Sequence, residues 1–282
     1  MDCTEELCQV DCCAMGVRVY GGASRSLRPL VLHFHGGAFV GGSLDGGRAV
    51  SSLLVEAGAV VVSADYPLAP KHPFPHALEA AYGALSWLHD QRGRWAGKRS
   101  RIFVAGEEAG GNLAAGLALM ARDQQAPALA GQILISPMLD AGMATCSIRE
   151  AEAGPVGCKW ADGWHQYLRS PDKAAHPYAS PLASSRLAGL PPALVLTAED
   201  DLMRDESLSY ARRLREAGVA VAEHVLPAPT GWPESLDQLP RVEAPSIQAV
   251  APEPPWRGVV RDRFAAFLNE NSPTRRAASV QP

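Results

Sequence analysis

Two short motifs place residues capable of chemistry directly after apolar, strand-like runs. The first is Val104–Ala114, which reads V-A-G-E-E-A-G-G-N-L-A and leads from such a run into a helical pattern. Its glycines permit a sharp turn and close packing of helix against strand, the context of a nucleophile elbow. The free N–H groups at a helix start favour negative charge, so Glu108 at the tip would be stabilised as a carboxylate. A carboxylate there can act as a general base.

The second motif is H-F-H-G-G-A-F, His33–Phe39, which also follows an apolar run. Consecutive glycines leave backbone N–H groups free to point at an oxygen that becomes negatively charged during a reaction. We therefore predict an oxyanion hole made by Gly36 and Gly37, together with the N–H of Ala109, the residue after the elbow tip.

Two further segments complete a pattern: D-Y-P-L-A-P-K-H-P-F-P at Asp65–Pro75, and T-A-E-D-D-L-M-R-D at Thr197–Asp205. With these four motifs in this order, the chain closely resembles the hormone-sensitive-lipase family of α/β-hydrolases. The resemblance runs from about residue 17 to residue 232 and returns over the last helix. It implies an eight-stranded α/β-hydrolase sheet, an oxyanion hole at Gly36 and Gly37, and Asp201 as the acidic member of a catalytic triad.

The chain departs from the family pattern at two catalytic positions. The family reads G-D-S-A-G-G where this chain reads G-E-E-A-G-G, so Glu108 stands at the position of the serine nucleophile. The loop that carries the family's histidine reads L-P-A-P-T-G-W here, with Thr230 at the histidine position. The resemblance therefore implies a degenerate triad of Glu108, Asp201 and Thr230, with a pocket lined by His35, Phe39, Glu107 and Trp232.

Three functions fit these departures. Serine hydrolysis needs a nucleophile and a histidine that moves its proton, and both are replaced. The preferred hypothesis is a repurposed lyase, cyclase or isomerase, in which Glu108 moves a proton and the hole holds an enolate oxygen. One alternative is a ligand-binding pseudoenzyme whose Glu108 folds back into the hole. The second alternative is a carboxylesterase-like hydrolase with weak activity.

The elements that must position these motifs follow from periodicity. Short runs rich in Val, Leu and Ile predict buried strands, and longer segments with apolar residues at three- and four-residue spacing predict helices. The expected strands are Leu30–Phe34, Ala59–Ala64, Ile102–Ala105, Gln132–Ser136, Ala193–Thr197 and Val219–Leu226, with Val17–Tyr20 as an early antiparallel strand. The expected helices are Ala49–Ala57, His76–Asp90, Gly111–Arg122, Asp205–Ala217 and Trp256–Asn269. This alternation predicts an α/β fold with a mostly parallel sheet covered on both faces.

We expect residues 1–282 to form a single domain. Residues 140–190 interrupt the alternation and hold one expected helix, Lys159–Leu168, so we interpret them as a cap or excursion segment. Residues 227–255 are rich in proline and are expected to form a long loop. Because the first expected strand begins soon after Met1, the family's N-terminal cap is expected to be reduced.

The amino-acid composition limits the classes of partner that the chain is expected to bind. The chain has 282 residues, 47% hydrophobic composition and a formal net charge of −4, so no basic surface for nucleic acid is expected. It has no apolar run near the roughly 20 residues that a membrane helix needs. The start of the chain is acidic and lacks the apolar stretch of a signal peptide, which predicts a cytoplasmic protein with reduced cysteines. We expect a small-molecule substrate or ligand, no metal and no cofactor; the family resemblance leaves a homodimer open.

Overall fold

The computed structural model describes residues 3–10, 13–22, 27–151, 155–237 and 253–272. Within them lies one eight-stranded sheet with the order β1-β2-β4-β3-β5-β6-β7-β8. The strands are β1 (Cys3–Val10), β2 (Cys13–Tyr20), β3 (Leu30–Phe34), β4 (Val60–Ala64), β5 (Ile102–Glu107), β6 (Gly131–Ile135), β7 (Ala193–Ala198) and β8 (Val221–Leu226). β1 pairs with β2 and β2 with β4 in antiparallel fashion, and the pairs from β4 through β8 are parallel. The predicted fold class, a mostly parallel eight-stranded sheet flanked by helices, is confirmed.

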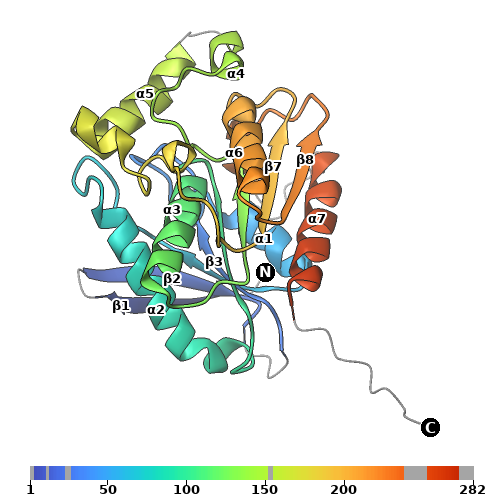
Figure 1. Cartoon of the computed structure of the whole chain (residues 1–282). Coiled ribbons are helices and arrows are strands. Elements are labelled where there is room, and N and C mark those ends of the chain that lie inside the picture. Colours follow the sequence, from blue (N-terminus) through green and yellow to red (C-terminus); the bar gives the residue numbers. More distant parts are fainter. Residues whose placement is uncertain (1–2, 11–12, 23–26, 152–154, 238–252, 273–282) are drawn as a thin grey trace, which may run out of the picture.

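Helices cover both faces of the sheet (Figure 1). Side chains from α2 (His76–Trp95), α3 (Glu108–Gln124) and α6 (Arg204–Glu216) share one apolar core with residues of the strands. Side chains from α1 (Arg48–Glu56) and α7 (Trp256–Glu270) form a second core on the opposite face. The inner strands β3 to β7 are buried along their whole length, as expected of a parallel sheet with two covered faces.

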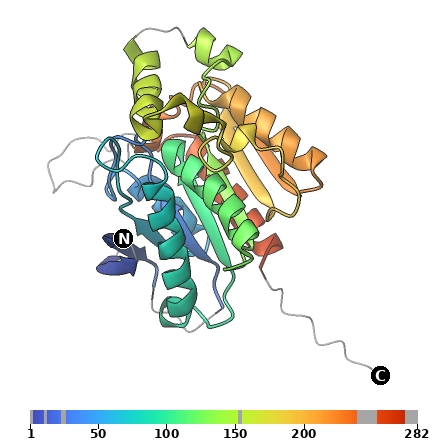
Figure 2. The same ribbon diagram turned by 60° about the vertical axis from the view of Figure 1, so that its left-hand side comes forward.

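The segment 140–190 leaves the sheet and carries α4 (Cys146–Glu150) and α5 (Pro155–Leu168), followed by two short 3₁₀ helices, η1 (Pro171–Ala175) and η2 (Pro181–Ala183). Both figures place α4 and α5 beyond the carboxyl ends of the parallel strands (Figures 1 and 2). After β8 the described chain continues through η3 (Glu234–Asp237), whereas residues 238–252 of the expected proline-rich loop lie outside the described residues.

Among the described strands and α-helices, β1 and α4 were not predicted. β1 is an edge strand with most of its side chains exposed, among them Leu7 at 66%, so its sequence lacks the apolar run that marks an inner strand. α4 spans only residues Cys146–Glu150, too few to show a helical period. In the part of the chain that the structure describes, no helix is both long enough and apolar enough to cross a membrane.

Candidate active site at the β5–α3 turn

β5 passes directly into α3 through a sharp turn between Glu107 and Glu108. Glu108 has a φ of 48°, a left-handed backbone conformation that a residue with a side chain adopts only under strain. A Cβ at Gly110 would collide with the backbone carbonyl oxygen of Phe34, so only glycine lets α3 approach β3 this closely. This contact explains why α3 begins at Glu108, although glycines are weak helix formers and the sequence pattern predicted a start at Gly111.

The Glu108 carboxyl group is fully buried at this turn. Its Oε2 accepts hydrogen bonds from the backbone N–H of Gly37 and from the indole N–H of Trp160, both at 3.4 Å. Its Oε1 is buried and has no hydrogen-bond partner among the described residues. Burial raises the pKa of Glu108 to about 7; the positive charge of Lys159 lowers it, and the negative charge of Asp237 raises it. Near neutral pH this group can both accept and release a proton.

The predicted oxyanion donors do not all face the same point. The Gly36 N–H donates to Glu107 Oε1 at 3.3 Å, whereas the Gly37 N–H donates to Glu108 Oε2. Ala109 is the second residue of α3, where backbone N–H groups lack intrahelical acceptors. The structure thus brings the Gly37 N–H to the elbow carboxylate and uses the Gly36 N–H to hold the neighbouring glutamate.

Glu107 lies beneath the turn. Its Oε2 is 2.8 Å from His33 Nε2, and His33 Nδ1 lies 3.0 Å from Ser63 Oγ and 3.2 Å from Ser51 Oγ. All four side chains are buried. Glu107 therefore ties the glycine turn after β3 to the end of β5, which makes its role structural support for the turn.

His35 and Phe39, the predicted pocket residues of the glycine motif, are buried as well. The His35 ring stacks on Tyr66 with centroids 4.5 Å apart, and its Nδ1 lies 2.8 Å from the Gly36 carbonyl oxygen. Phe39 stacks on Tyr167 of α5, with ring centroids 4.0 Å apart. Phe39 thus anchors α5 over the glycine turn.

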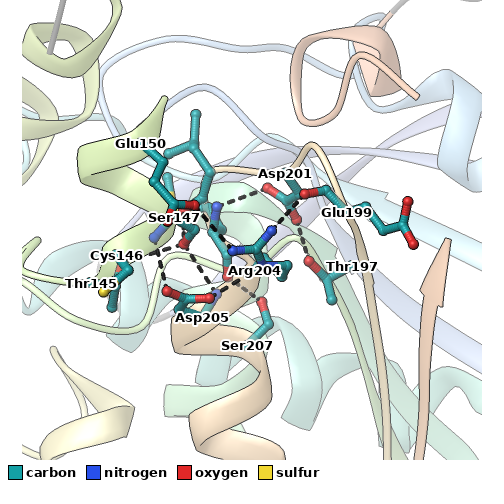
Figure 3. Close-up of polar contacts among 12 residues, drawn as sticks. Thr145, Cys146, Ser147, Glu150, Thr197, Glu199, Asp201, Arg204, Asp205 and Ser207 are labelled. Carbon is teal, nitrogen blue, oxygen red and sulfur yellow. Dashed lines mark hydrogen bonds and ion pairs between the residues drawn. The ribbon is translucent and has the colours of Figure 1, made fainter. Parts of the chain in front are cut away.

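Asp201 is held from several sides in the loop after β7. Its Oδ1 accepts from Ser136 Oγ at 2.8 Å and from the Met203 N–H at 2.9 Å. Its Oδ2 accepts from Thr197 Oγ1 at 2.6 Å, a contact visible in Figure 3. Burial raises the pKa of Asp201 despite these hydrogen bonds.

Thr230 meets the neighbouring carboxylate, Asp200. Its hydroxyl donates to Asp200 Oδ1 and its N–H to Oδ2, both at 2.7 Å, and the Gly231 N–H donates to Oδ2 at 2.9 Å. The sequence paired Thr230 with Asp201 through the family resemblance. The Asp-Asp pair was visible in the sequence, but nothing in it showed which member faces the Thr230 loop.

Trp232, expected to line the pocket, packs elsewhere. It is 2% exposed and meets the Trp256 ring of α7 edge-on, with centroids 5.5 Å apart. It belongs to the core beneath α1 and α7. An aromatic residue after a catalytic loop gives no indication of which face of the sheet it will cover.

A hydrogen-bonded network joins α4 to the start of α6 beside Asp201 (Figure 3). The Ser147 N–H donates to Asp205 Oδ2 at 2.8 Å, and its hydroxyl donates to the Leu202 carbonyl at 2.8 Å. The Asp205 N–H donates back to Ser147 Oγ at 3.2 Å. The network fixes segment 140–190 to the loop that carries Asp200 and Asp201.

Sequence reasoning missed three groups that act on Glu108. Lys159 and Trp160 belong to the expected helix Lys159–Leu168, and Asp237 belongs to the expected loop 227–255. None of them lies in a motif, because all three act on Glu108 only through tertiary structure. In the residues that the structure describes, no group of three or more His, Cys, Asp or Glu side chains is arranged to hold a metal ion.

Comparison with known proteins identifies the scaffold. A family model described as "alpha/beta hydrolase fold" matches residues 31–229. An arylesterase of Saccharolobus solfataricus is 35% identical over 207 residues, covering 72% of this chain and 67% of that protein. Carboxylesterase NlhH of Mycobacterium tuberculosis is 37% identical over 73% of this chain and 66% of its own. Carboxylic ester hydrolase LipN of the same species is 40% identical over 71% of this chain and 55% of its own. The chain thus matches about two thirds or less of these relatives' lengths.

Solved structures give the same result. EstE1, a thermostable carboxylesterase from a metagenomic library, has a TM-score of 0.82 and 31% identity, over 96% of this chain and 90% of its own. The esterase of Pyrobaculum calidifontis has a TM-score of 0.80 and 34% identity, over 95% of this chain and 86% of its own.

These relatives overturn the preferred functional expectation. A lyase, cyclase or isomerase was inferred from Glu108 and Thr230, yet the relatives and structures compared above are named as esterases or ester hydrolases. These relatives favour an active esterase over the lyase, cyclase or isomerase hypothesis and over the pseudoenzyme hypothesis. The expectation failed because two altered positions were given more weight than the scaffold that surrounds them. On the match of its sequence and of its sheet, the chain belongs to the α/β-hydrolase fold family, in its hormone-sensitive-lipase branch.

Proposed function

We propose that this chain is a carboxylesterase-like hydrolase of weak activity toward small carboxylic esters, with Glu108 as the general base that activates water. Family membership and the esterase relatives support ester hydrolysis. The observation that carries the residue assignment is Glu108 itself. It sits at the elbow tip with Oε2 hydrogen-bonded, Oε1 without a partner among the described residues, and a pKa of about 7.

The reaction follows from that geometry. At pH 7 about half of the Glu108 side chains are ionised, since the pKa is about 7. Oε1 takes a proton from water as the water oxygen bonds to the ester carbonyl carbon, and the carbonyl electrons move onto its oxygen. The N–H of Ala109 stabilises this oxyanion. When the electrons return, the bond to the alcohol oxygen breaks, and the alcohol leaves with the proton held by Glu108.

Weak turnover is expected for a physical reason. Water replaces a covalently tethered nucleophile, so the advantage of an attacking group already held in place is reduced. Thr230 cannot replace an imidazole as a proton carrier near neutral pH, and its hydroxyl already donates to Asp200.

Hydrolysis of p-nitrophenyl acetate tests the proposal. We expect turnover above the buffer rate, and a loss of roughly 10²- to 10⁴-fold in Glu108→Gln, which keeps the shape but removes the base. Glu216→Gln, an exposed site on α6, is the matched control and should retain the wild-type rate. Wild-type turnover equal to buffer, or an unchanged rate in Glu108→Gln, would refute the proposal.

A single turnover in ¹⁸O-labelled water tests for covalent attack by Glu108. A general base places the label in the acetate product only, whereas a nucleophilic carboxylate forms an acyl anhydride, and water that attacks the glutamyl carbonyl of this anhydride leaves ¹⁸O in Glu108. Mass spectrometry of the peptide that contains Glu108 reads the difference. Label in that peptide would overturn the assignment of Glu108 as a base on water.

Two further points accompany the proposal: the cytoplasmic location that the sequence predicts, and the homodimer that the family resemblance leaves open. Cell fractionation tests the first, and sedimentation of the purified chain tests the second.

A further inference from the structure

α5 packs directly on the glycine turn that follows β3, at Gly163 and Ala38. A Cβ at Gly163 would collide with the backbone carbonyl oxygen of Ala38, so the helix touches the turn through a residue without a side chain. Phe39 stacks on Tyr167 of the same helix. These contacts fix the height of α5 above Glu108.

One side chain of α5 reaches the elbow carboxylate. The indole Nε1 of Trp160 is 3.4 Å from Glu108 Oε2, the oxygen that also accepts from the Gly37 N–H at 3.4 Å. Trp160 has no exposed surface, so this contact is made away from bulk water. Two donors from separate parts of the chain, α5 and the turn after β3, therefore converge on a single oxygen.

The two oxygens of Glu108 consequently have different environments. Oε2 accepts hydrogen bonds from two donors, whereas Oε1 is buried without a partner in the described part of the chain. A hydrogen-bonded carboxylate oxygen is the poorer proton acceptor, because protonation would cost it those bonds. Proton transfer is therefore directed to Oε1.

We infer that Trp160 is a positioning residue for Glu108: its indole N–H holds Oε2, orients the carboxyl group and leaves Oε1 as the atom that takes the proton. This inference rests on the proposed function. Tryptophan suits the task because its N–H donates and never accepts, so it favours the ionised carboxylate. The Lys159 ammonium lies over the Trp160 ring, 4.9 Å from its centroid, and its positive charge lowers the pKa of Glu108.

Trp160→Phe tests the inference, since it retains an aromatic ring and removes the N–H. Losing one hydrogen bond to a charged group should lower the acid dissociation constant of Glu108 roughly tenfold. The pH at which ester hydrolysis reaches half its maximum should rise accordingly, with kcat at pH 7 falling roughly fivefold, because the ionised fraction of Glu108 drops from about one half to about one tenth. At higher pH much of the lost rate should return. Trp87→Phe on α2, whose ring meets Trp95 with centroids 5.0 Å apart, is the control and should leave the profile unchanged.

Two measurements keep this test independent of catalysis and of the variant's folding. ¹³C NMR of labelled glutamate gives the pKa of Glu108 in the wild type and in Trp160→Phe. In the wild type alone, the indole ¹H–¹⁵N signal of Trp160 should titrate with Glu108, and this titration should vanish in Glu108→Gln.

An unchanged Glu108 pKa in Trp160→Phe would overturn the inference even if esterase activity is present. So would a Trp160 indole signal whose chemical shift does not change as Glu108 titrates. Absence of wild-type esterase activity would instead refute the proposed function and leave the carboxylate–indole contact to be judged by NMR. The two failures are therefore distinguishable.

Discussion

Burial and hydrogen bonding act in opposite directions on the Glu108 carboxyl group. Burial favours the neutral form, while the donors at Gly37 and Trp160 favour the ionised form, and burial is the stronger effect. The turn motif predicted that Glu108 stands at the strand-to-helix turn, and α3 begins at this residue. It predicted a stabilised carboxylate, because only the helix N-terminus was visible and not the side chains that close over the site.

Stability should depend on pH through this residue. The folded-state pKa of Glu108 is about 7, above its ordinary value of 4.5, so the folded state binds the proton more tightly than the unfolded state. Proton binding by Glu108 therefore adds to the free energy of unfolding in full below pH 4.5, and this contribution is lost as the pH rises towards 7.

Urea unfolding of the wild type and Glu108→Gln between pH 4 and 8 measures this effect. We expect the free energy of unfolding of Glu108→Gln relative to wild type to increase with pH, by roughly 3 kcal/mol across the range. A difference that stays constant with pH would contradict the shifted pKa.

The loop after β8 depends on Asp200. Burial raises the pKa of Asp200, but the hydrogen bonds from Gly231 and Thr230 outweigh burial and lower it below its ordinary value. Because a lowered carboxyl pKa stabilises the folded state above its ordinary range, the loop should loosen as the pH falls through the lowered value.

Asp200→Ala removes the acceptor of three hydrogen bonds from Thr230 and Gly231. We expect faster amide exchange at Thr230 and Gly231, and a loss of about 1–3 kcal/mol in the free energy of unfolding. Hydrogen exchange followed by mass spectrometry on the 227–233 peptide measures the first effect. Exchange in the β5 peptide, far from this loop in sequence, is the internal control. Equal exchange of the loop peptide in the wild type and in Asp200→Ala would show that Asp200 does not hold this loop.

The position of α5 depends on Gly163. In Gly163→Ala the new methyl group would collide with the Ala38 carbonyl, so the helix must move away from the turn. Trp160, buried in the wild type, should then meet water, which shifts tryptophan emission to longer wavelength. Gly258→Ala is the matched control, because a Cβ at that glycine of α7 meets nothing within 4 Å. An unshifted spectrum in Gly163→Ala would show that α5 tolerates the methyl group in place.

At the scale of the whole molecule, periodicity predicted the inner sheet well. Leu30–Phe34 is β3 with both ends as expected, because a strand covered on both faces needs an uninterrupted apolar run. The edge strand β1 escaped prediction because one side of it faces solvent and carries Glu5. The site was predicted only in part: the motif residues come from turns next to strands, whereas Trp160 and Asp237 come from outside the motifs and act on Glu108 only through tertiary structure.

The hold of Asp200 on the Thr230 loop has an evolutionary consequence. A serine at position 108 would gain a proton acceptor from this loop only if position 230 became histidine, and that substitution removes the hydroxyl that donates to Asp200 Oδ1. Each change alone sacrifices existing contacts and supplies no complete proton path. Serine chemistry at this elbow therefore requires two coordinated substitutions, and neither of them alone supplies it.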